Sequence, residues 1–182
     1  MSALSIDWPS TDFSRVPYAV FVDPEIYARE QERIFKGPYW CYLALEAEIP
    51  KPGDYVVVYV GDAPVVVVRG RDGKVNAFVN RCAHRGSTVV RALQGHADDF
   101  TCVYHHWRYD LEGHLLSVPF QRGIAGQGGM PPSFDRKCHN LPILRVETYR
   151  GLAFGTFHAD APPLTAYLGP KMIEGIDRIF RK

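Results

Sequence analysis

Two short motifs, each with one cysteine and one histidine, constrain this chain more than any other feature. The first reads CAHRG over residues 82–86, and the second reads CVYHHW over residues 102–107. Thiolate and imidazole are ligands that zinc and iron–sulfur clusters accept. If the two loops meet, they supply four ligands to one centre, namely Cys82, His84, Cys102 and His105. The sequence therefore predicts a fold that brings two loops together around a metal.

The alternating order of the ligands narrows the choice of metal. Two loops that each supply a cysteine and then a histidine can place both sulfurs on one side and both imidazoles on the other. This arrangement suits a [2Fe–2S] cluster in which two cysteines bind one iron and two histidines bind the other. Zinc also accepts two cysteines and two histidines, but zinc-finger spacing pairs cysteine with cysteine and histidine with histidine. Zinc remains the alternative.

The two motifs resemble the cluster loops of Rieske proteins, in the form found in the large (α) subunits of ring-hydroxylating oxygenases. The resemblance continues in four shorter stretches, which are EAEIP at 46–50 with the following Gly53 and Asp54, NRC at 80–82, VPF at 118–120 and GGMP at 128–131. It is closest to α subunits that accept aromatic carboxylates, such as salicylate, anthranilate and terephthalate oxygenases. The resemblance implies that Cys82 and Cys102 bind one iron and that His84 and His105 bind the other.

The resemblance also implies roles for the neighbours of these ligands. Arg85 and Gly86 are expected to shape the first loop, with the glycine allowing a tight backbone near the cluster. Tyr104 and Trp107 belong to the second motif, and Trp107 is expected to cover the cluster against water, with a simple core aromatic as the alternative. Because Trp107 stands where a hydroxyl donor to sulfur could have stood, we expect a potential in the lower part of the Rieske range. His106 departs from many relatives, and we interpret it as an electron-transfer contact or as an idle surface histidine.

The function implied is one-electron transfer to a mononuclear non-haem iron site that hydroxylates an aromatic substrate. The implied partners are a ferredoxin or flavin reductase as electron donor and neighbouring oxygenase subunits in an oligomer. After His106 no histidine pair has a carboxylate at suitable spacing, so we expect that this chain alone does not activate oxygen. Two alternatives remain, a free-standing Rieske ferredoxin and a structural zinc module. No role is assigned to the other cysteines and histidines, which are Cys41, Cys138, His96, His114, His139 and His158.

The rest of the chain predicts a mostly β fold, an antiparallel β-sandwich with an N-terminal helix and a C-terminal helical tail, and the resemblance implies that it is of the Rieske type, with a cluster-binding subdomain. Runs rich in β-branched and aromatic residues alternate with turn residues such as Asp72-Gly73, which is a strong hairpin signal. Val65–Val68 is apolar on both faces and therefore predicts a buried central strand. The expected strands are 40–45, 55–60, 64–69, 75–79, 107–109, 115–117, 143–146 and 152–157.

The chain divides into three expected segments. The first segment, residues 1–38, consists of an extended arm at 1–22 and a helix from about Pro24 to Lys36. Asp23 is expected to cap this helix. Its expected packing residues are Ile26, Tyr27, Ile34 and Phe35. Residues 39–160 form the Rieske domain, in which the glycine- and proline-rich excursion 119–140 either covers something functional or is a solvated loop. Residues 161–182 form a helical connector toward a missing catalytic domain. Its apolar stripe consists of Met172, Ile173, Ile176, Ile179 and Phe180.

Charge and hydropathy exclude several classes of function. The formal net charge is +1, which offers no electrostatic basis for binding nucleic acid or an anionic membrane surface. No apolar run approaches the roughly 18 residues of a membrane span, and no secretory signal is visible at the first residues. Four cysteines in a chain without a leader favour reduced thiols and metal ligation. We therefore expect a cytoplasmic protein.

Overall fold

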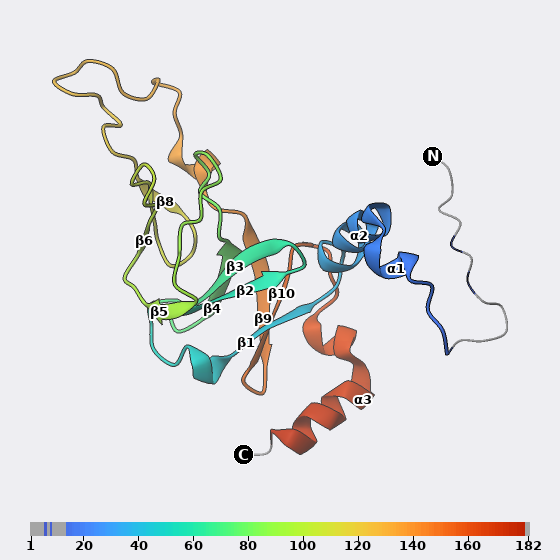
Figure 1. Cartoon of the computed structure of the whole chain (residues 1–182). Helices are drawn as coiled ribbons and strands as arrows, with labels where there is room; N and C mark the ends of the chain where they lie inside the picture. Colours follow the sequence, from blue (N-terminus) through green and yellow to red (C-terminus); the bar gives the residue numbers. More distant parts are fainter. Residues whose placement is uncertain (1–5, 7, 9–13, 181–182) are drawn as a thin grey trace.

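The computed structural model describes residues 6, 8 and 14–180 and is built mainly from antiparallel strands (Figure 1). The strands are β1 (Cys41–Leu45), β2 (Asp54–Val60), β3 (Ala63–Arg69), β4 (Val75–Val79), β5 (Gln94–His96), β6 (Phe100–Thr101), β7 (Arg108–Tyr109), β8 (Leu115–Ser117), β9 (Ile143–Tyr149) and β10 (Leu152–Thr156). Seven of them form one sheet in the order β1-β10-β9-β4-β3-β2-β5, and β6-β7-β8 form a small second sheet. The expected mostly antiparallel β fold is confirmed. The short strands β5 and β6 were not among the expected strands.

The large sheet curls, so that β1 at one end also contacts β2 near the other. Strand β3 lies between β2 and β4, and Val65–Val68 is completely buried, as the sequence predicts. Successive side chains of a strand point to opposite faces. Val65 and Val67 therefore contribute to the core enclosed by the curled sheet, whereas Val66 and Val68 contribute to a second core.

The second core lies between the large sheet and the small sheet, and it contains both motif cysteines, Cys82 and Cys102. Phe78 of β4 and Phe100 of β6 meet edge to face in this core with ring centroids 5.7 Å apart. Aromatic pairs in this geometry stabilise a core beyond the area they bury. The two candidate metal loops are thus supported by β3 and β4 on one side and by the small sheet on the other.

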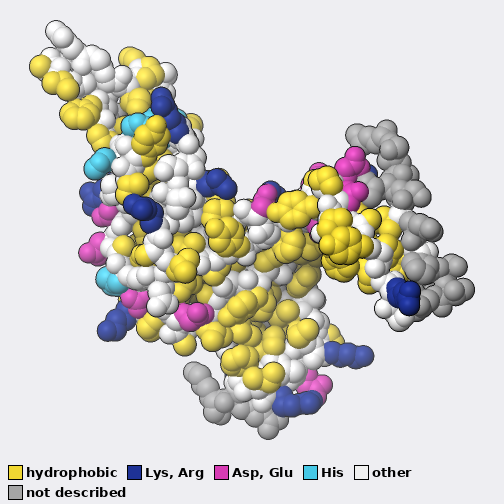
Figure 2. Space-filling view, in the orientation of Figure 1, with side chains coloured by type: hydrophobic (Ala, Val, Ile, Leu, Met, Phe, Trp, Pro, Cys, Tyr) yellow, Lys and Arg dark blue, Asp and Glu magenta, His cyan; other side chains and the backbone are white. Residues whose placement is uncertain are grey.

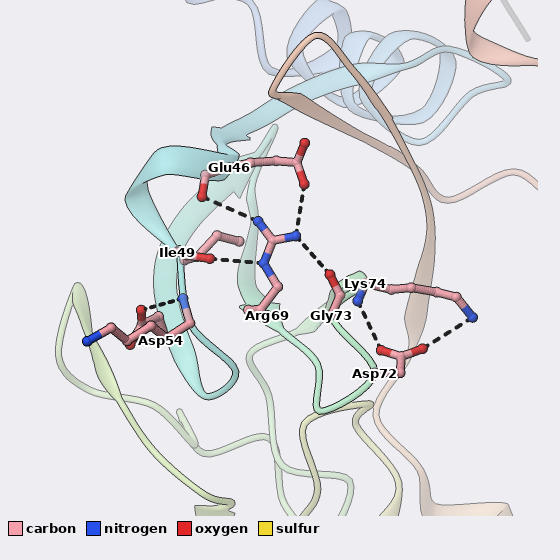
Figure 3. Close-up of polar contacts among 8 residues, drawn as sticks. Glu46, Ile49, Asp54, Arg69, Asp72, Gly73 and Lys74 are labelled. Atoms are coloured by element: carbon pink, nitrogen blue, oxygen red, sulfur yellow. Dashed lines mark hydrogen bonds and ion pairs between the residues drawn. The ribbon is translucent and has the colours of Figure 1, made fainter.

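Arg69 at the end of β3 ties three backbone segments together (Figure 3). Its guanidinium donates to the carbonyl of Ile49, to the carbonyl and carboxylate of Glu46, and to the carbonyl of Gly73 in the β3–β4 turn. Glu46 belongs to the short helix η2 (Glu46–Glu48), which links β1 to β2. Because the planar guanidinium presents several fixed donors, one side chain satisfies carbonyls that the strand ladders leave free.

The N-terminal region forms helices that differ in two ways from the expectation. Asp23 caps α2 (Pro24–Glu30) by accepting from the backbone N–H groups of Glu25 and Ile26, as the sequence predicts. However, a helical turn, α1 (Ala19–Val22), replaces the end of the expected extended arm, and the earlier part of that arm lies largely outside the described residues. The second half of the expected helix is a π-helix, η1 (Gln31–Phe35).

The π-helix changes which side chains face the sheet. Tyr27 and Ile34, expected to be packing residues, are exposed, whereas Gln31 is buried. The wider turn of a π-helix rotates its residues relative to an α-helix, so an α-helical pattern predicts the wrong face for Ile34; it does not account for Tyr27, which lies before the π-helix in α2. The Gln31 amide oxygen accepts from the backbone N–H of Asp62 in the β2–β3 turn, at 2.8 Å. Figure 2 shows exposed hydrophobic side chains over α1 and α2.

The tail forms the expected helix, α3 (Leu164–Ile179), with a break at Gly169, whose φ of 69° is not helical. The Glu147 carboxylate accepts from the Leu164 backbone N–H at the start of α3. Near the end of α3, Asp177 accepts from the hydroxyl of Tyr149 in β9 and from the guanidinium of Arg150. The described residues contain no helix with the length and apolar character that crossing a membrane requires.

The segment between β8 and β9 projects away from the large sheet, beyond the small sheet (Figure 1). This is the glycine- and proline-rich excursion 119–140. Its return limb contains a short helix, η3 (Arg136–His139), in which Asp135 accepts from the backbone N–H of Lys137. The excursion is therefore ordered by local hydrogen bonds where it approaches the candidate metal loops.

Candidate metal centre

The two motif loops share one backbone hydrogen-bond pattern, although they belong to different sheets. The first loop follows β4, and the second connects β6 to β7. In each loop the cysteine N–H donates to the carbonyl five residues later, and the residue four positions after the cysteine donates back to the cysteine carbonyl. The four bonds are Cys82 N to Ser87 O, Gly86 N to Cys82 O, Cys102 N to Trp107 O and His106 N to Cys102 O, at 2.8–2.9 Å.

This shared pattern requires a left-handed backbone at the fourth position after each cysteine. Gly86 has φ of 70° and His106 has φ of 56°. Glycine adopts such angles without steric cost, whereas a histidine there is strained by roughly 1–2 kcal/mol. The geometry therefore explains why a glycine suits this position in the first loop. It also shows that His106 departs from the residue type that the loop prefers.

The structure places the two predicted cysteine ligands next to each other in the core and the two predicted histidine ligands next to each other nearer the surface. Cys82 and Cys102 are buried, at 4% and 1% exposure, and they lie in the core between the sheets. His84 and His105 are partly exposed, and their ring centroids are 4.5 Å apart at an interplanar angle of 75°. Both imidazoles thus leave the core on the same side, which is the arrangement that the alternating motif predicts.

The surroundings set the protonation of these side chains. Burial raises the pKa of the Cys82 thiol, and the neighbouring Cys102 raises it further. A buried thiol of this kind becomes a thiolate when a metal replaces its proton. Burial, together with the charges of His105 and Arg85, lowers the pKa of His84. His84 is therefore neutral at pH 7 and keeps a nitrogen lone pair that can bind a metal.

The fit of a metal to this site can be judged from the two imidazoles. Among the described residues, the buried side-chain nitrogen or oxygen atoms without a hydrogen-bond partner are His84 Nδ1 and His105 Nδ1. An unpaired buried polar atom costs about 1–3 kcal/mol, so two of them in contacting rings call for an explanation. A metal bound at both nitrogens satisfies them, and two buried thiols stand beside them. The residues present fit a centre with two thiolate and two imidazole ligands.

Aromatic rings enclose the two imidazoles. Trp107 is buried and lies parallel to His84, with centroids 4.9 Å apart and an interplanar angle of 10°. The Tyr104 ring is 3.9 Å from that of His105 and is largely exposed. Arg85 is exposed on the first loop, next to His84. Figure 2 shows histidine side chains at the surface on this side of the molecule.

A groove of about 550 Å³ opens beside the imidazoles. It runs between the second loop and the start of the excursion, and its lining residues are His84, His105, His106, Trp107, Val118, Pro119, Phe120 and Met130. His106 is exposed at its edge. The predicted electron-transfer contact therefore lies beside both candidate ligand rings.

Tyr109 is a site residue that the sequence analysis missed. It is completely buried, and its hydroxyl lies 3.3 Å from Cys82 Sγ and accepts from the Ala83 backbone N–H at 3.1 Å. Burial raises the pKa of Tyr109, as does the hydrogen bond with Cys82, so the hydroxyl keeps its proton and can donate it to a thiolate. Strand alternation offered a signal, because Tyr109 follows Trp107 by two residues and so shares its face.

Replacing Tyr109 by phenylalanine is expected to lower the midpoint potential of a cluster bound here. The hydroxyl donates to a ligand sulfur, and such hydrogen bonds stabilise the more negative reduced state. If the bond contributes about 1.4 kcal/mol more to the reduced state, the potential falls by about 60 mV. A redox titration followed by electron paramagnetic resonance (EPR) measures this shift. Tyr59→Phe, the same change at an exposed tyrosine of β2, serves as the control. Equal potentials in the Tyr109→Phe and Tyr59→Phe proteins would contradict this role for the hydroxyl.

The remaining cysteines and histidines do not join the four. Cys41 packs against the core of the curled sheet, and Cys138 is exposed in η3. Among the described residues, the group of potential ligands whose ligand atoms all lie within 4.8 Å of one another comprises Asp110, Glu112 and His114. Asp110 accepts from the backbone N–H groups of Glu112 and His114, so ordinary turn geometry accounts for their proximity.

Comparisons with known proteins agree with the site. A family model described as the Rieske [2Fe-2S] domain matches residues 39–143. The chain is 56% identical over 180 residues to the anthranilate 1,2-dioxygenase large subunit of Burkholderia cepacia, covering 99% of this chain and 43% of that protein. It is 44% identical over 177 residues to a terephthalate 1,2-dioxygenase α subunit of Comamonas sp, covering 97% and 43%. The chain thus spans less than half of the length of these relatives.

A solved structure shares the fold. The naphthalene 1,2-dioxygenase of Rhodococcus sp., bound to indole, superposes with a TM-score of 0.78 at 36% sequence identity. The match covers 90% of this chain and 36% of that one. The similarity therefore includes the segments on both sides of residues 39–143 as well as the two loops.

Proposed function

Because this chain belongs to the Rieske [2Fe-2S] domain family, in the form found in the N-terminal part of ring-hydroxylating dioxygenase large subunits, we propose that Cys82, His84, Cys102 and His105 are its cluster ligands. The observation that carries the proposal is the pair of unpartnered Nδ1 atoms on His84 and His105, beside two buried thiols. Two thiolates on one iron and two imidazoles on the other define a Rieske cluster.

The proposed ligands and their neighbours have different roles in an electron-transfer site. A bound [2Fe–2S] cluster takes up and releases one electron at a time. The buried sulfurs keep their end of the site dry, and the Tyr109 hydroxyl lies 3.3 Å from Cys82 Sγ, where it can donate to a thiolate. The imidazoles point to the surface, and Trp107 shields one face of His84 from water. A partner can therefore approach through the imidazole edges, which are the partly exposed side of the proposed ligand set.

We infer that the natural acceptor is a mononuclear non-haem iron in an aromatic ring-hydroxylating oxygenase. The relatives that support this are larger proteins that act on anthranilate and terephthalate, so an aromatic carboxylate is the proposed substrate class. The proposed donor is a ferredoxin or a flavin reductase, and the proposed assembly is an oligomer of oxygenase subunits. His106 and the groove beside it form the proposed contact surface.

The same reasoning extends to the organisation and location of the protein. We propose that residues 1–38, 39–160 and 161–182 are an N-terminal arm with its helices, the Rieske domain and a connector. The exposed Met172 and Ile179 of α3 offer apolar surface for a further domain. The free cysteines suit a reducing compartment, and the proposed location is the cytoplasm.

The proposal is tested by the metal content and the redox behaviour of the purified protein. We expect a red-brown protein with two irons and two acid-labile sulfides per chain, bleached by dithionite and restored by air. The reduced form should give an EPR signal with an average g value below that of an all-cysteine cluster. A colourless protein with one zinc per chain and no EPR signal would refute the proposal and favour the zinc alternative.

A further inference from the structure

Two side chains at the base of the excursion close around Trp107. Phe134 meets Trp107 edge to face, with centroids 6.0 Å apart at 80°, and His139 meets it at 5.6 Å and 69°. Phe134 and His139 also contact each other at 4.6 Å. Trp107 therefore lies between these two rings and the imidazole of His84, on which it stacks. The four rings form one contiguous group that joins the excursion to the metal centre.

Hydrogen bonds hold His139 and the backbone that follows it in place. His139 Nδ1 donates to the carbonyl of Asp135 at 2.8 Å, across the single turn of η3. After η3, the Asn140 amide oxygen accepts from the Leu115 N–H in β8, and the Leu141 N–H donates to the Gly113 carbonyl. These bonds attach the return limb to β8 and the turn before it, in the small sheet whose strand β7 begins directly after Trp107. The contact is therefore built into the fold.

His84 needs such support because no hydrogen bond orients its ring. Metal-binding histidines are usually held by a hydrogen bond to the nitrogen that does not bind the metal. Neither ring nitrogen of His84 has a hydrogen-bond partner among the described residues, and only stacking and van der Waals contacts define the plane of the imidazole. Trp107 provides the parallel contact, so whatever fixes Trp107 also fixes His84.

We propose that Phe134 and His139 are positioning residues for the metal centre, which hold Trp107 flat against His84 and thereby set the orientation of that ligand. The proposal rests on the ligand role of His84 given above. It assigns a task to the base of the excursion, which covers the tryptophan of the cluster site. It also gives a role to His139, a histidine to which the sequence offers no motif.

The test uses His139→Ala as the first variant, because this side chain is only partly buried and its loss should leave the fold intact. His139→Phe is the matched variant, since it restores an aromatic ring against Trp107. Ile124→Ala is the control on the same excursion, at a residue that is exposed and outside the ring group. Phe134→Leu provides a second, independent perturbation that keeps an apolar side chain.

Two measurements read out the orientation directly. The protein contains three tryptophans, so 5-fluorotryptophan labelling gives three ¹⁹F resonances, and Trp107→Phe identifies the one of interest. We expect this resonance to shift in His139→Ala and Phe134→Leu and to stay near its wild-type position in His139→Phe and Ile124→Ala. In the reduced protein, pulsed EPR should show a changed nitrogen coupling for one histidine ligand in the same two variants. Iron loss to a chelator should become about tenfold faster, as expected for the loss of one or two aromatic contacts.

The outcomes separate this inference from the proposed function. A wild-type protein without a cluster would refute the ligand assignment, while the fluorine resonance would still report whether Phe134 and His139 fix Trp107. Unchanged fluorine and EPR signals in both His139→Ala and Phe134→Leu would overturn the inference. A shifted Trp107 resonance with unchanged nitrogen couplings would overturn it as well, because Trp107 would then move without consequence for His84.

Discussion

Replacement of either His84 or His105 by alanine is expected to yield a folded protein that no longer holds a [2Fe–2S] cluster. Each substitution removes an Nδ1 atom that has no other partner, and it leaves one iron with a single protein ligand. The loss of affinity should exceed the roughly 10- to 100-fold penalty for removing a group that merely supports a ligand. Iron and sulfide analysis, visible absorption and EPR measure the loss, and circular dichroism checks that the fold persists.

The chain offers matched controls for this experiment. His96 and His114 are instead paired with carboxylates, those of Asp54 and Asp110, and neither belongs to the two motif loops. His96→Ala and His114→Ala should therefore keep the full complement of iron. Cys82→Ser and Cys102→Ser should behave like the ligand histidine variants. A His84→Ala protein with wild-type iron and an unaltered EPR signal would show that the cluster, if present, is held elsewhere.

Replacement of Asn80 by alanine is expected to cost about 3 kcal/mol of the free energy of unfolding. Asn80 is 1% exposed and precedes the first loop. Its amide nitrogen donates to the Val90 carbonyl, and its amide oxygen accepts from the N–H groups of Val89 and Val90. Asn80 thus joins the two ends of the loop that contains Cys82 and His84. Alanine leaves three buried backbone groups unpaired, each at a cost of about 1–3 kcal/mol before relaxation.

Urea denaturation of the wild-type and variant proteins measures this difference in the free energy of unfolding. Asn76→Ala is the control, since Asn76 lies in β4, the strand that Asn80 directly follows, is less buried, and makes one side-chain bond, to the Leu111 carbonyl. It should cost about 1 kcal/mol. We also expect Asn80→Ala to lose iron faster than Asn76→Ala, because the first loop opens. Equal stabilities of the two variants would show that the loop does not depend on the Asn80 bonds.

Patterns among neighbouring residues predicted those parts of the fold that are determined by neighbouring residues. The four-valine run at 65–68 indicated a strand buried on both faces, and the Asp23 cap indicated where a helix begins; both are confirmed. The π-helix at 31–35 was not predicted, because nothing in an α-helical periodicity signals an extra residue in one turn. The strands β5 and β6 are too short to show a pattern, and they exist because β2 and β7 offer them partners.

The same holds for the site: the residues in the two motifs were predicted from the sequence, and those that reach the site only through the fold were not. Four of its residues share two motifs in which cysteine and histidine are close in sequence, so spacing alone brought them to notice. Tyr109 and His139 reach the site through strand pairing and the return of a long excursion, at separations of 27 residues from Cys82 and 55 from His84. Such contacts are properties of the folded chain. Only strand alternation, which puts Tyr109 on the same face as Trp107, offered a partial signal.

The two-sided burial of β3 has a consequence for how the domain responds to its cofactor. Val65 and Val67 stabilise the curled sheet, while Val66 and Val68 stabilise the core that contains Cys82 and Cys102. One strand cannot unfold on one face only, so the two cores melt together. Ligand binding to the native state adds its free energy to the unfolding of everything coupled to that state. Occupancy of the metal centre is therefore thermodynamically linked to the curled sheet, and depletion of iron would lower the free energy of unfolding of the whole domain.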